Sequence, residues 1–229
     1  MATANDLIRV YLEVGDKKTF AVALDWPGWA RSGRDEDSAL QALYDYGPRY
    51  ERALKWTPLG FKAPSDISAF EVVEILPGTT TTDFGAPDAA LPWDDDLVAD
   101  EEVKRWRTVL KACWKAFDDA VEAAAGKTLR KGPRGGGRDL PKMIEHVRDV
   151  DKAYLGSLGG SVKIDKAAEP IATLPAIRQA ILDAIAGRLS GDIPAEGARG
   201  GHRWAPRYFV RRLAWHELDH AWEIEDKAE

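Results

Sequence analysis

The sequence predicts a mixed α+β fold, in which a small N-terminal β-α-β domain precedes a four-helix bundle. Two observations favour this fold class. Apolar and polar residues alternate in the first third of the chain, as in half-buried strands, whereas from residue 100 onward apolar residues recur every three or four positions, as in amphipathic helices. A stretch without either period separates these parts. We therefore expect an α+β domain at 1–78, a linker at 79–99 and a helical domain at 100–229.

Three segments of the N-terminal part have the character of strands. Residues 7–14 alternate, residues 20–24 are a short apolar run, and the polar residues 16–18 between them predict a hairpin. Residues 25–33 have the composition of a loop. Residues 68–76 predict the third strand, which Pro77 and Gly78 end.

One helix is expected between the second and third predicted strands. Apolar residues follow a helical spacing over residues 38–54. Gly47 and Pro48 interrupt this pattern, and proline has no N–H to donate within a helix. We therefore predict a kink or a break at this pair.

Four helices are expected in the C-terminal part, and four helices joined by loops suggest a bundle. They cover residues 100–125, 139–158, 173–189 and about 206–226. Asp139 and Thr173 are the predicted caps, because their side chains can accept a hydrogen bond from the first turn. The last helix has a second apolar side, which the N-terminal domain or a second subunit must cover. That side consists of Ala214, Trp215, Leu218 and Trp222.

Composition excludes several classes of protein. The 229 residues contain no apolar run long enough to span a membrane and no secretory signal at the start. The only cysteine, Cys113, lies on an apolar stripe, so it is expected in the core, and no intrachain disulfide can form. These features predict a cytoplasmic protein without a membrane partner. A net charge of −6 makes a nucleic-acid partner unlikely.

Three of the four histidines are candidate metal ligands. His216 and His220 are one helical turn apart, and at 100° per residue both fall on the inward stripe of the last helix. His146 falls on the flank of the inward stripe of the second predicted helix. Three neutral imidazoles suit a divalent metal, zinc or nickel above all, and leave an open coordination position. Hydrogen-bonded core histidines are the alternative, and we expect His202 on the surface.

Two segments resemble the DinB-like family of metal-binding four-helix bundles. They are MIEHVRDVDKAYLGSLG at 143–159 and RRLAWHELDHAWEIED at 211–226, and the likeness extends from about residue 100 to the C-terminus. Carried over by position, the three metal ligands of the family are His146, His216 and His220. Many relatives have a tryptophan shortly before the helix of the first histidine, where this chain has Gly-Gly-Gly-Arg at 135–138. The substrate therefore stays open.

This resemblance implies more than a fold. Bundles of this family often dimerise, so a homodimer is among the expected partners. Some members transfer or isomerise groups with low-molecular-weight thiols, which makes such a thiol a candidate cofactor beside the metal. The N-terminal segments IRVYLEV and FAVALDWPGWARSGRDEDSALQAL resemble the HicB antitoxin fold. We use that likeness for the fold only.

Glu217 is the candidate catalytic residue. Residues 216–220 also satisfy the H-E-x-x-H pattern of zinc proteases, in which the glutamate is a general base. The third ligand of those enzymes lies further downstream, and only nine residues follow His220 here. The alternatives for Glu217 are a base in another water-activating reaction and a solvated or pairing glutamate.

Arginines gather just before the helices that carry the histidines. One basic run spans 127–138 and another spans 199–212. From these runs we expect Arg134, Arg138 and Arg212 to contact an anionic small-molecule substrate, and solvated loops are the alternative.

We therefore predict a metal-dependent enzyme, specifically a thiol-dependent transferase or isomerase acting on a small anionic substrate. A non-catalytic module, in which metal stabilises the bundle and the N-terminal domain binds a partner, is the alternative. An H-E-x-x-H zinc hydrolase is a minor third possibility.

Overall fold

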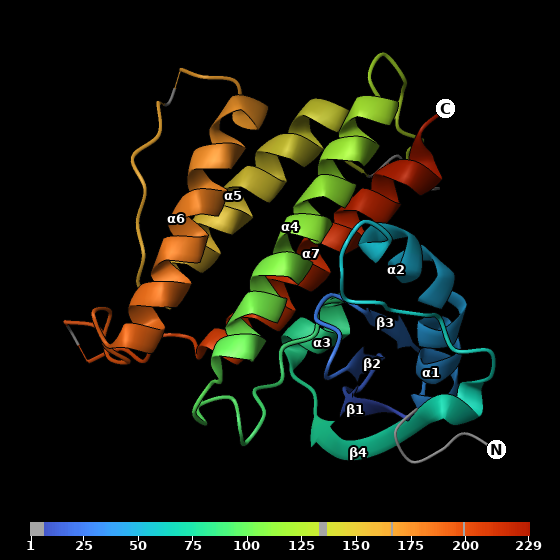
Figure 1. Cartoon of the computed structure of the whole chain (residues 1–229). Coiled ribbons are helices and arrows are strands. Elements are labelled where there is room, and N and C mark those ends of the chain that lie inside the picture. The colour runs from blue at the N-terminus through green and yellow to red at the C-terminus, as the bar shows by residue number, and fades with distance from the viewer. Residues whose placement is uncertain (1–6, 133–136, 166, 199) are drawn as a thin grey trace.

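The computed structural model describes residues 7–132, 137–165, 167–198 and 200–229. It has the predicted mixed α+β class, with strands first and a helical region after them. Figure 1 shows the sheet with its helices on one side of four long helices. None of the helices in the described part of the chain is long and apolar enough to cross a membrane.

The sheet has four strands in the order β3-β2-β1-β4. The strands are β1 (Ile8–Val14), β2 (Thr19–Ala23), β3 (Ala30–Gly33) and β4 (Phe70–Pro77). The β1–β2 hairpin is antiparallel, as predicted, and pairs Leu12 with Ala21. On its other side β1 runs parallel to β4, where Leu12 pairs with Ile75. Four successive residues of β1, from Val10 to Glu13, are buried, so both faces of this strand are covered.

One strand of the sheet was not expected. Residues 25–33 were predicted as a loop, but Ala30–Gly33 forms β3 and pairs antiparallel with β2. Its sequence, ARSG, has no apolar alternation, and only Ala30 is buried. The partner strand, rather than the local sequence, therefore makes this segment a strand.

The helix predicted at 38–54 is two helices, as the Gly47-Pro48 pair indicated. They are α1 (Glu36–Asp45) and α2 (Gly47–Leu54). Asp35 caps α1 by accepting a hydrogen bond from the Ser38 N–H at 2.8 Å, and the Ser38 hydroxyl accepts one from the Asp35 N–H. Helix α1 packs against β2 and β3, whereas α2 packs against α4, the first of the long helices (Asp100–Ala123).

The segment predicted as a linker is folded and partly buried. It contains α3 (Thr80–Phe84), which follows the short 3₁₀ turn Ile67–Ala69 and β4 in the chain. The fully buried Glu13 carboxylate of β1 accepts hydrogen bonds from the Asp88 and Ala89 N–H groups and from the Thr82 hydroxyl. A buried carboxylate supplied with donors by the loop attaches that loop to the sheet.

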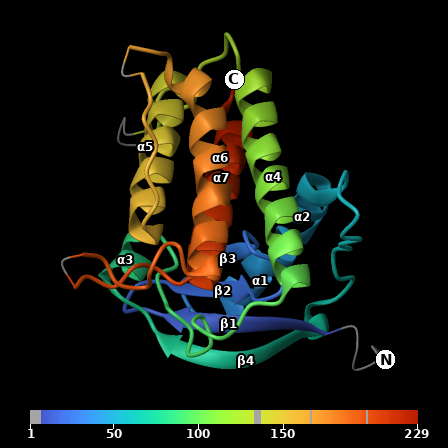
Figure 2. The ribbon, with the colours of Figure 1, turned by 60° about the vertical axis from the view of Figure 1, so that its left-hand side comes forward.

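Four long helices make up the rest of the chain (Figure 2). They are α4 (Asp100–Ala123), α5 (Leu140–Leu158), α6 (Pro170–Ser190) and α7 (Pro206–Lys227). Asp139 caps α5 as predicted, accepting from the Lys142 N–H at 3.0 Å. The cap predicted at Thr173 is wrong, because α6 begins one turn earlier. Its Thr173 hydroxyl donates to the Pro170 carbonyl instead.

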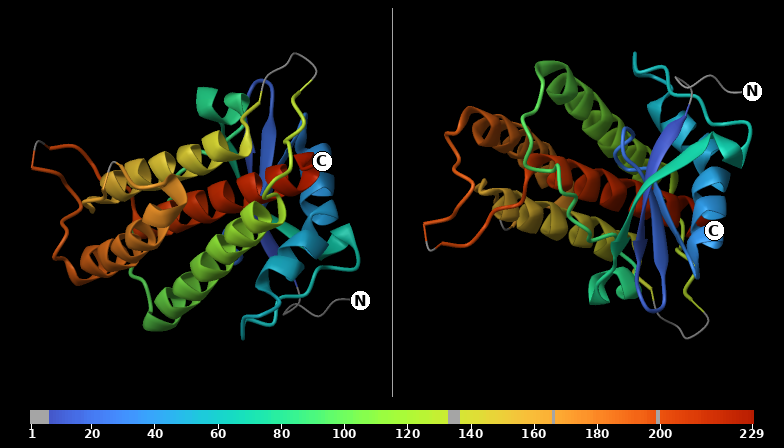
Figure 3. Two further views of the ribbon diagram at one scale, coloured as in Figure 1. Left: turned by 90° about the horizontal axis from the view of Figure 1, so that it is seen from above. Right: turned by 90° about the horizontal axis from the view of Figure 1, so that it is seen from below.

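Helix α7 is the element on which both parts of the molecule pack. Sixteen of its 22 residues are buried, and they occupy every face of the helix. It packs against α4 and α5, and it lies next to the sheet, α1 and α2 (Figure 3). Trp215 meets Phe20 of β2 edge to face, and Trp222 lies 5.1 Å from the Tyr46 ring. The N-terminal part therefore covers the second apolar side of this helix.

Candidate metal centre

Helical phase brings His216 and His220 to the inner side of α7, as the sequence predicts. Their relative exposures are 5% and 8%. His146 lies half-buried on α5, between the fully buried Met143 and Val147. Because α5 packs against α7, these positions bring the three imidazoles together. We call His146, His216 and His220 the histidine cluster.

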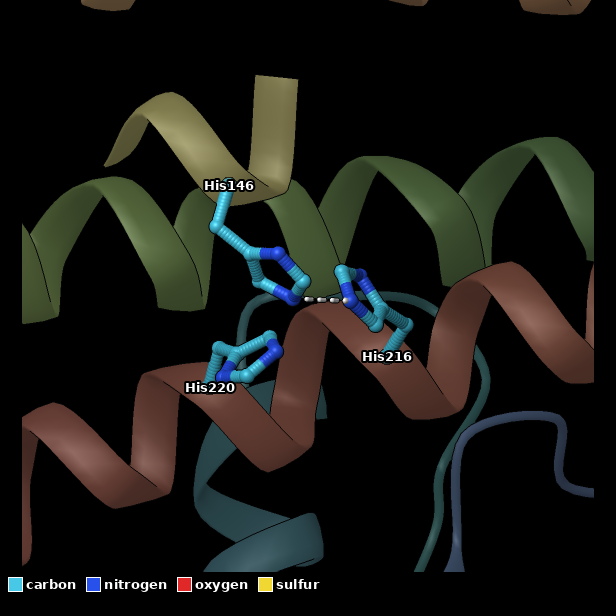
Figure 4. Close-up of side chains that lie close together, drawn as sticks. All are labelled: His146, His216 and His220. Atoms are coloured by element: carbon cyan, nitrogen blue, oxygen red, sulfur yellow. Dashed lines mark hydrogen bonds between the residues drawn. The ribbon is translucent and has the colours of Figure 1, made fainter. Parts of the chain in front are cut away.

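One ring nitrogen from each of the three histidines lies within 4.8 Å of the other two. Nε2 of His146 and Nε2 of His216 are 3.3 Å apart (Figure 4). The His220 ring centroid is 4.5 Å from that of His216 and 4.9 Å from that of His146. In the part of the chain that the structure describes, no other group of three potential ligands comes so close.

The spacing of the ring nitrogens can be compared with that of a metal site. Two nitrogens bound to a tetrahedral zinc ion, each at about 2.0–2.1 Å, are about 3.3–3.4 Å apart. The observed distance of 3.3 Å between His146 and His216 fits this edge. In the absence of an ion, the same distance corresponds to a hydrogen bond between the two rings. One of the two nitrogens must then carry a proton, because two lone pairs repel each other. The donor set therefore fits a metal ion.

The surroundings of His146 and His216 keep these two rings neutral. Burial, followed by the neighbouring His220 and Arg138, lowers the pKa of His146 to about 4. Burial also lowers the pKa of His216 well below its ordinary value, and the charges of His220 and His146 act in the same direction. Neutral imidazoles at pH 7 are the form that ligates metals. His146 and His216 therefore each have a nitrogen lone pair that can bind a cation.

His216 and His220 differ in the hydrogen bonding of their Nδ1 atoms. Nδ1 of His220 lies 3.0 Å from a carboxylate oxygen of Glu223, one turn further along α7. Nδ1 of His216 is buried and has no hydrogen-bond partner among the described residues. The hydrogen bond from His220, with Lys227 assisting, lowers the pKa of Glu223 to about 2. His220 therefore has a charged partner that His216 lacks.

Glu217, the predicted base, lies apart from the histidine cluster. Its side chain is fully buried beside Asp151, and one oxygen is 3.9 Å from Nη2 of Arg178. Burial raises the pKa of both Asp151 and Glu217, and the neighbouring Glu217 charge raises the pKa of Asp151 further. This placement favours a role in the core over the predicted role as a base.

The sequence reading missed this acidic pair and its arginine. Arg178 of α6 bridges to Asp118 of α4 with two hydrogen bonds, of 2.7 and 2.9 Å. Asp151 and Arg178 occupy inward positions of helices whose neighbouring inward residues are apolar. A charged residue inside an apolar stripe was the available signal, because such a residue requires a buried partner.

The predicted substrate-binding arginines differ in their surroundings. Arg212 is 9% exposed and donates to the Tyr154 hydroxyl at 3.0 Å and to the Pro87 carbonyl. It is thus engaged with the protein. Arg138 is exposed at the start of α5, close enough for its charge to act on His146 and His216. Arg134 lies outside the described residues.

Tyr154 is the aromatic residue that borders the cluster. Its ring centroid is 5.8 Å from that of His216, and its hydroxyl accepts the hydrogen bond from Arg212. On its other side Tyr154 contacts Trp204, at 4.9 Å between ring centroids, and Trp204 in turn contacts Tyr208. The sequence did not indicate this contact between Tyr154 and His216.

Two further residues lie where the sequence predicts. His202 is exposed in the loop before α7, where it forms an isolated bridge with Glu196. Cys113 is fully buried on α4, and burial raises the pKa of its thiol well above the ordinary value. A thiol that stays protonated in the core is not a nucleophile.

Two cavities lie away from the histidines. One, of about 590 Å³, is enclosed by β1, β4 and the starts of α4 and α7, where arginines such as Arg9 and Arg207 line it. The other, of about 300 Å³, lies between α2, α4 and α7 beside Trp56. None of the three histidines lines either cavity.

No family model, curated protein or solved structure matches this chain. The case for the site therefore depends on its own geometry. The likenesses to DinB-like bundles and to HicB stay predictions.

Proposed function

We propose that His146, His216 and His220 bind a divalent metal ion and that the chain is a metal-dependent enzyme. The observation that carries this proposal is the convergence of three ring nitrogens, from two helices, to within 4.8 Å of one another. The DinB-like resemblance of α5 and α7, with its four-helix bundle, supports the same three ligands.

The donor set indicates which ions are expected. Imidazole nitrogens favour zinc, nickel and copper over magnesium and calcium, which prefer oxygen ligands. Zinc or nickel is our preferred ion. Three protein ligands leave room for a fourth, and this is the arrangement of catalytic rather than structural zinc sites.

The chemistry expected at such a centre is simple. A bound ion acts as a Lewis acid and lowers the pKa of a coordinated water or thiol. The exposed Arg138 attracts an anionic group toward the histidines, and Tyr154 presents an aromatic face beside His216. We therefore favour a thiol-dependent transferase or isomerase, with a low-molecular-weight thiol and a small anionic substrate. A homodimer is part of this proposal, as in many DinB-like proteins.

A non-catalytic module is the second candidate, and burial favours it. His216 and His220 are almost inaccessible, and neither cavity reaches them. In that case the ion would only stabilise the helices, and the HicB-like N-terminal part would bind a partner. A zinc hydrolase has less support, because Glu217 faces Asp151 and Arg178.

Cobalt substitution distinguishes the enzyme from the module. The protein loaded with Co²⁺ is titrated with cysteine as the probe thiol, and its visible and near-ultraviolet absorption is recorded. If the fourth position is open, a sulfur-to-cobalt charge-transfer band should appear and saturate. The matched control is His202→Ala, which changes a histidine outside the cluster and should give the same spectra. Unchanged spectra in the presence of excess thiol would favour the module instead.

A further inference from the structure

Glu223 contacts one of the proposed metal ligands, His220. It lies three residues after His220 on α7, so its side chain is on the same face of the helix. One carboxylate oxygen is 3.0 Å from Nδ1 of His220, and the other accepts from Nζ of Lys227 at 2.5 Å. The side chain is 25% exposed, so water only partly screens these contacts.

Resting on the metal centre proposed above, we propose that Glu223 is its positioning residue. A carboxylate can only accept, so Nδ1 of His220 carries the proton of this hydrogen bond, and a ring in the form that binds metals has no second proton. The lone pair of Nε2 then stays free. Figure 4 shows one nitrogen of each ring directed toward the space between the three rings. Glu223 therefore selects the tautomer of His220 that can bind an ion there.

The contact also determines which histidine binds most strongly. A carboxylate that accepts from the second nitrogen of a ligand ring holds the ring in place and makes the ligating nitrogen more basic. Of the two histidines on α7, only His220 has such a partner among the described residues, because Nδ1 of His216 is without one. Lys227 holds the carboxylate in place from the other side. His220 is thus the preorganised ligand of the cluster.

The test uses two variants and two readouts. Glu223→Ala removes the acceptor, whereas Glu223→Gln keeps an oxygen that can accept from Nδ1 but loses the charge. Zinc affinity is measured by competition with a chromophoric chelator, and the ring tautomer of His220 by ¹⁵N NMR of the metal-free protein. We expect zinc to bind about 10–100 times more weakly to Glu223→Ala and less weakly to Glu223→Gln. In metal-free Glu223→Ala the His220 proton should move toward Nε2.

Glu225→Gln is the matched control, because Glu225 lies on the same turn but pairs with Arg49 at 2.6 Å. It should leave both the zinc affinity and the tautomer unchanged. If Glu223→Ala and Glu223→Gln bind zinc as tightly as the wild type, the positioning role is overturned while the metal centre stands. If the wild type itself binds no zinc, the proposed function fails and this role fails with it.

Discussion

Replacing Phe209 with alanine is expected to lower the free energy of unfolding by about 3–5 kcal/mol. Phe209 is fully buried on α7, in the cluster of apolar residues that includes β1, α1 and α4 as well. The truncation removes a large apolar side chain and leaves a cavity that the surrounding elements can fill only in part. Urea unfolding followed by circular dichroism measures the change.

Phe84→Ala is the control for that prediction. It makes the same truncation at the end of α3, but the side chain is 91% exposed. Its effect on the free energy of unfolding should stay within about 0.5 kcal/mol. Similar losses for both variants would show that Phe209 does not occupy the core described here.

Zinc should raise the free energy of unfolding, and this gain should depend on the histidine cluster. At a free zinc concentration about a thousand times the dissociation constant, one site that exists only in the folded state adds about 4 kcal/mol to the free energy of unfolding. His216→Ala removes a ligand and should abolish most of this gain. Urea unfolding is measured with zinc and with a chelator for both proteins.

The fourth histidine again supplies the comparison. His202→Ala should keep the full gain from zinc, because His202 is exposed and outside the cluster. An equal gain for wild type and His216→Ala would mean that zinc acts elsewhere on the chain. If zinc raises the free energy of unfolding of none of these proteins, the ion does not stabilise the fold.

Local chemistry made much of the fold predictable. The cap at Asp139, the break at Gly47 and the end of the second long helix at residue 158 each depend on neighbouring residues, and the structure confirms all three. The strand β3 was missed because its surroundings hold it, whereas the five-residue helix α3, which Thr79 caps and Gly85 ends, is too short to show a helical period. β3 depends on its pairing with β2, and the segment after α3 depends on Glu13, more than 70 residues earlier in the chain.

The candidate site divides in the same way. The positions of His216 and His220 follow from helical spacing, and His146 joins them because α5 packs against α7. The partners of these residues could not be predicted, because they depend on how the helices are rotated against each other. Glu217 thus lies beside Arg178 and is not part of the histidine cluster.

Arg212 shows why composition alone is a poor guide to a binding role. It belongs to a basic run that predicts contact with an anion, yet its guanidinium is occupied by Tyr154 and the Pro87 carbonyl. A buried arginine finds acceptors within the protein, since leaving its donors unpaired would be costly. Arg138, which is exposed, keeps the predicted role as a proposal.

Elemental analysis of the purified protein tests the central claim most directly. The metal content is measured after exposure to zinc and nickel and extensive dialysis, for wild type, His216→Ala and His202→Ala. The account predicts about one ion per chain in the wild type and in His202→Ala, and far less in His216→Ala. A wild type that retains no metal, or a His216→Ala variant that retains as much as the wild type, would contradict it.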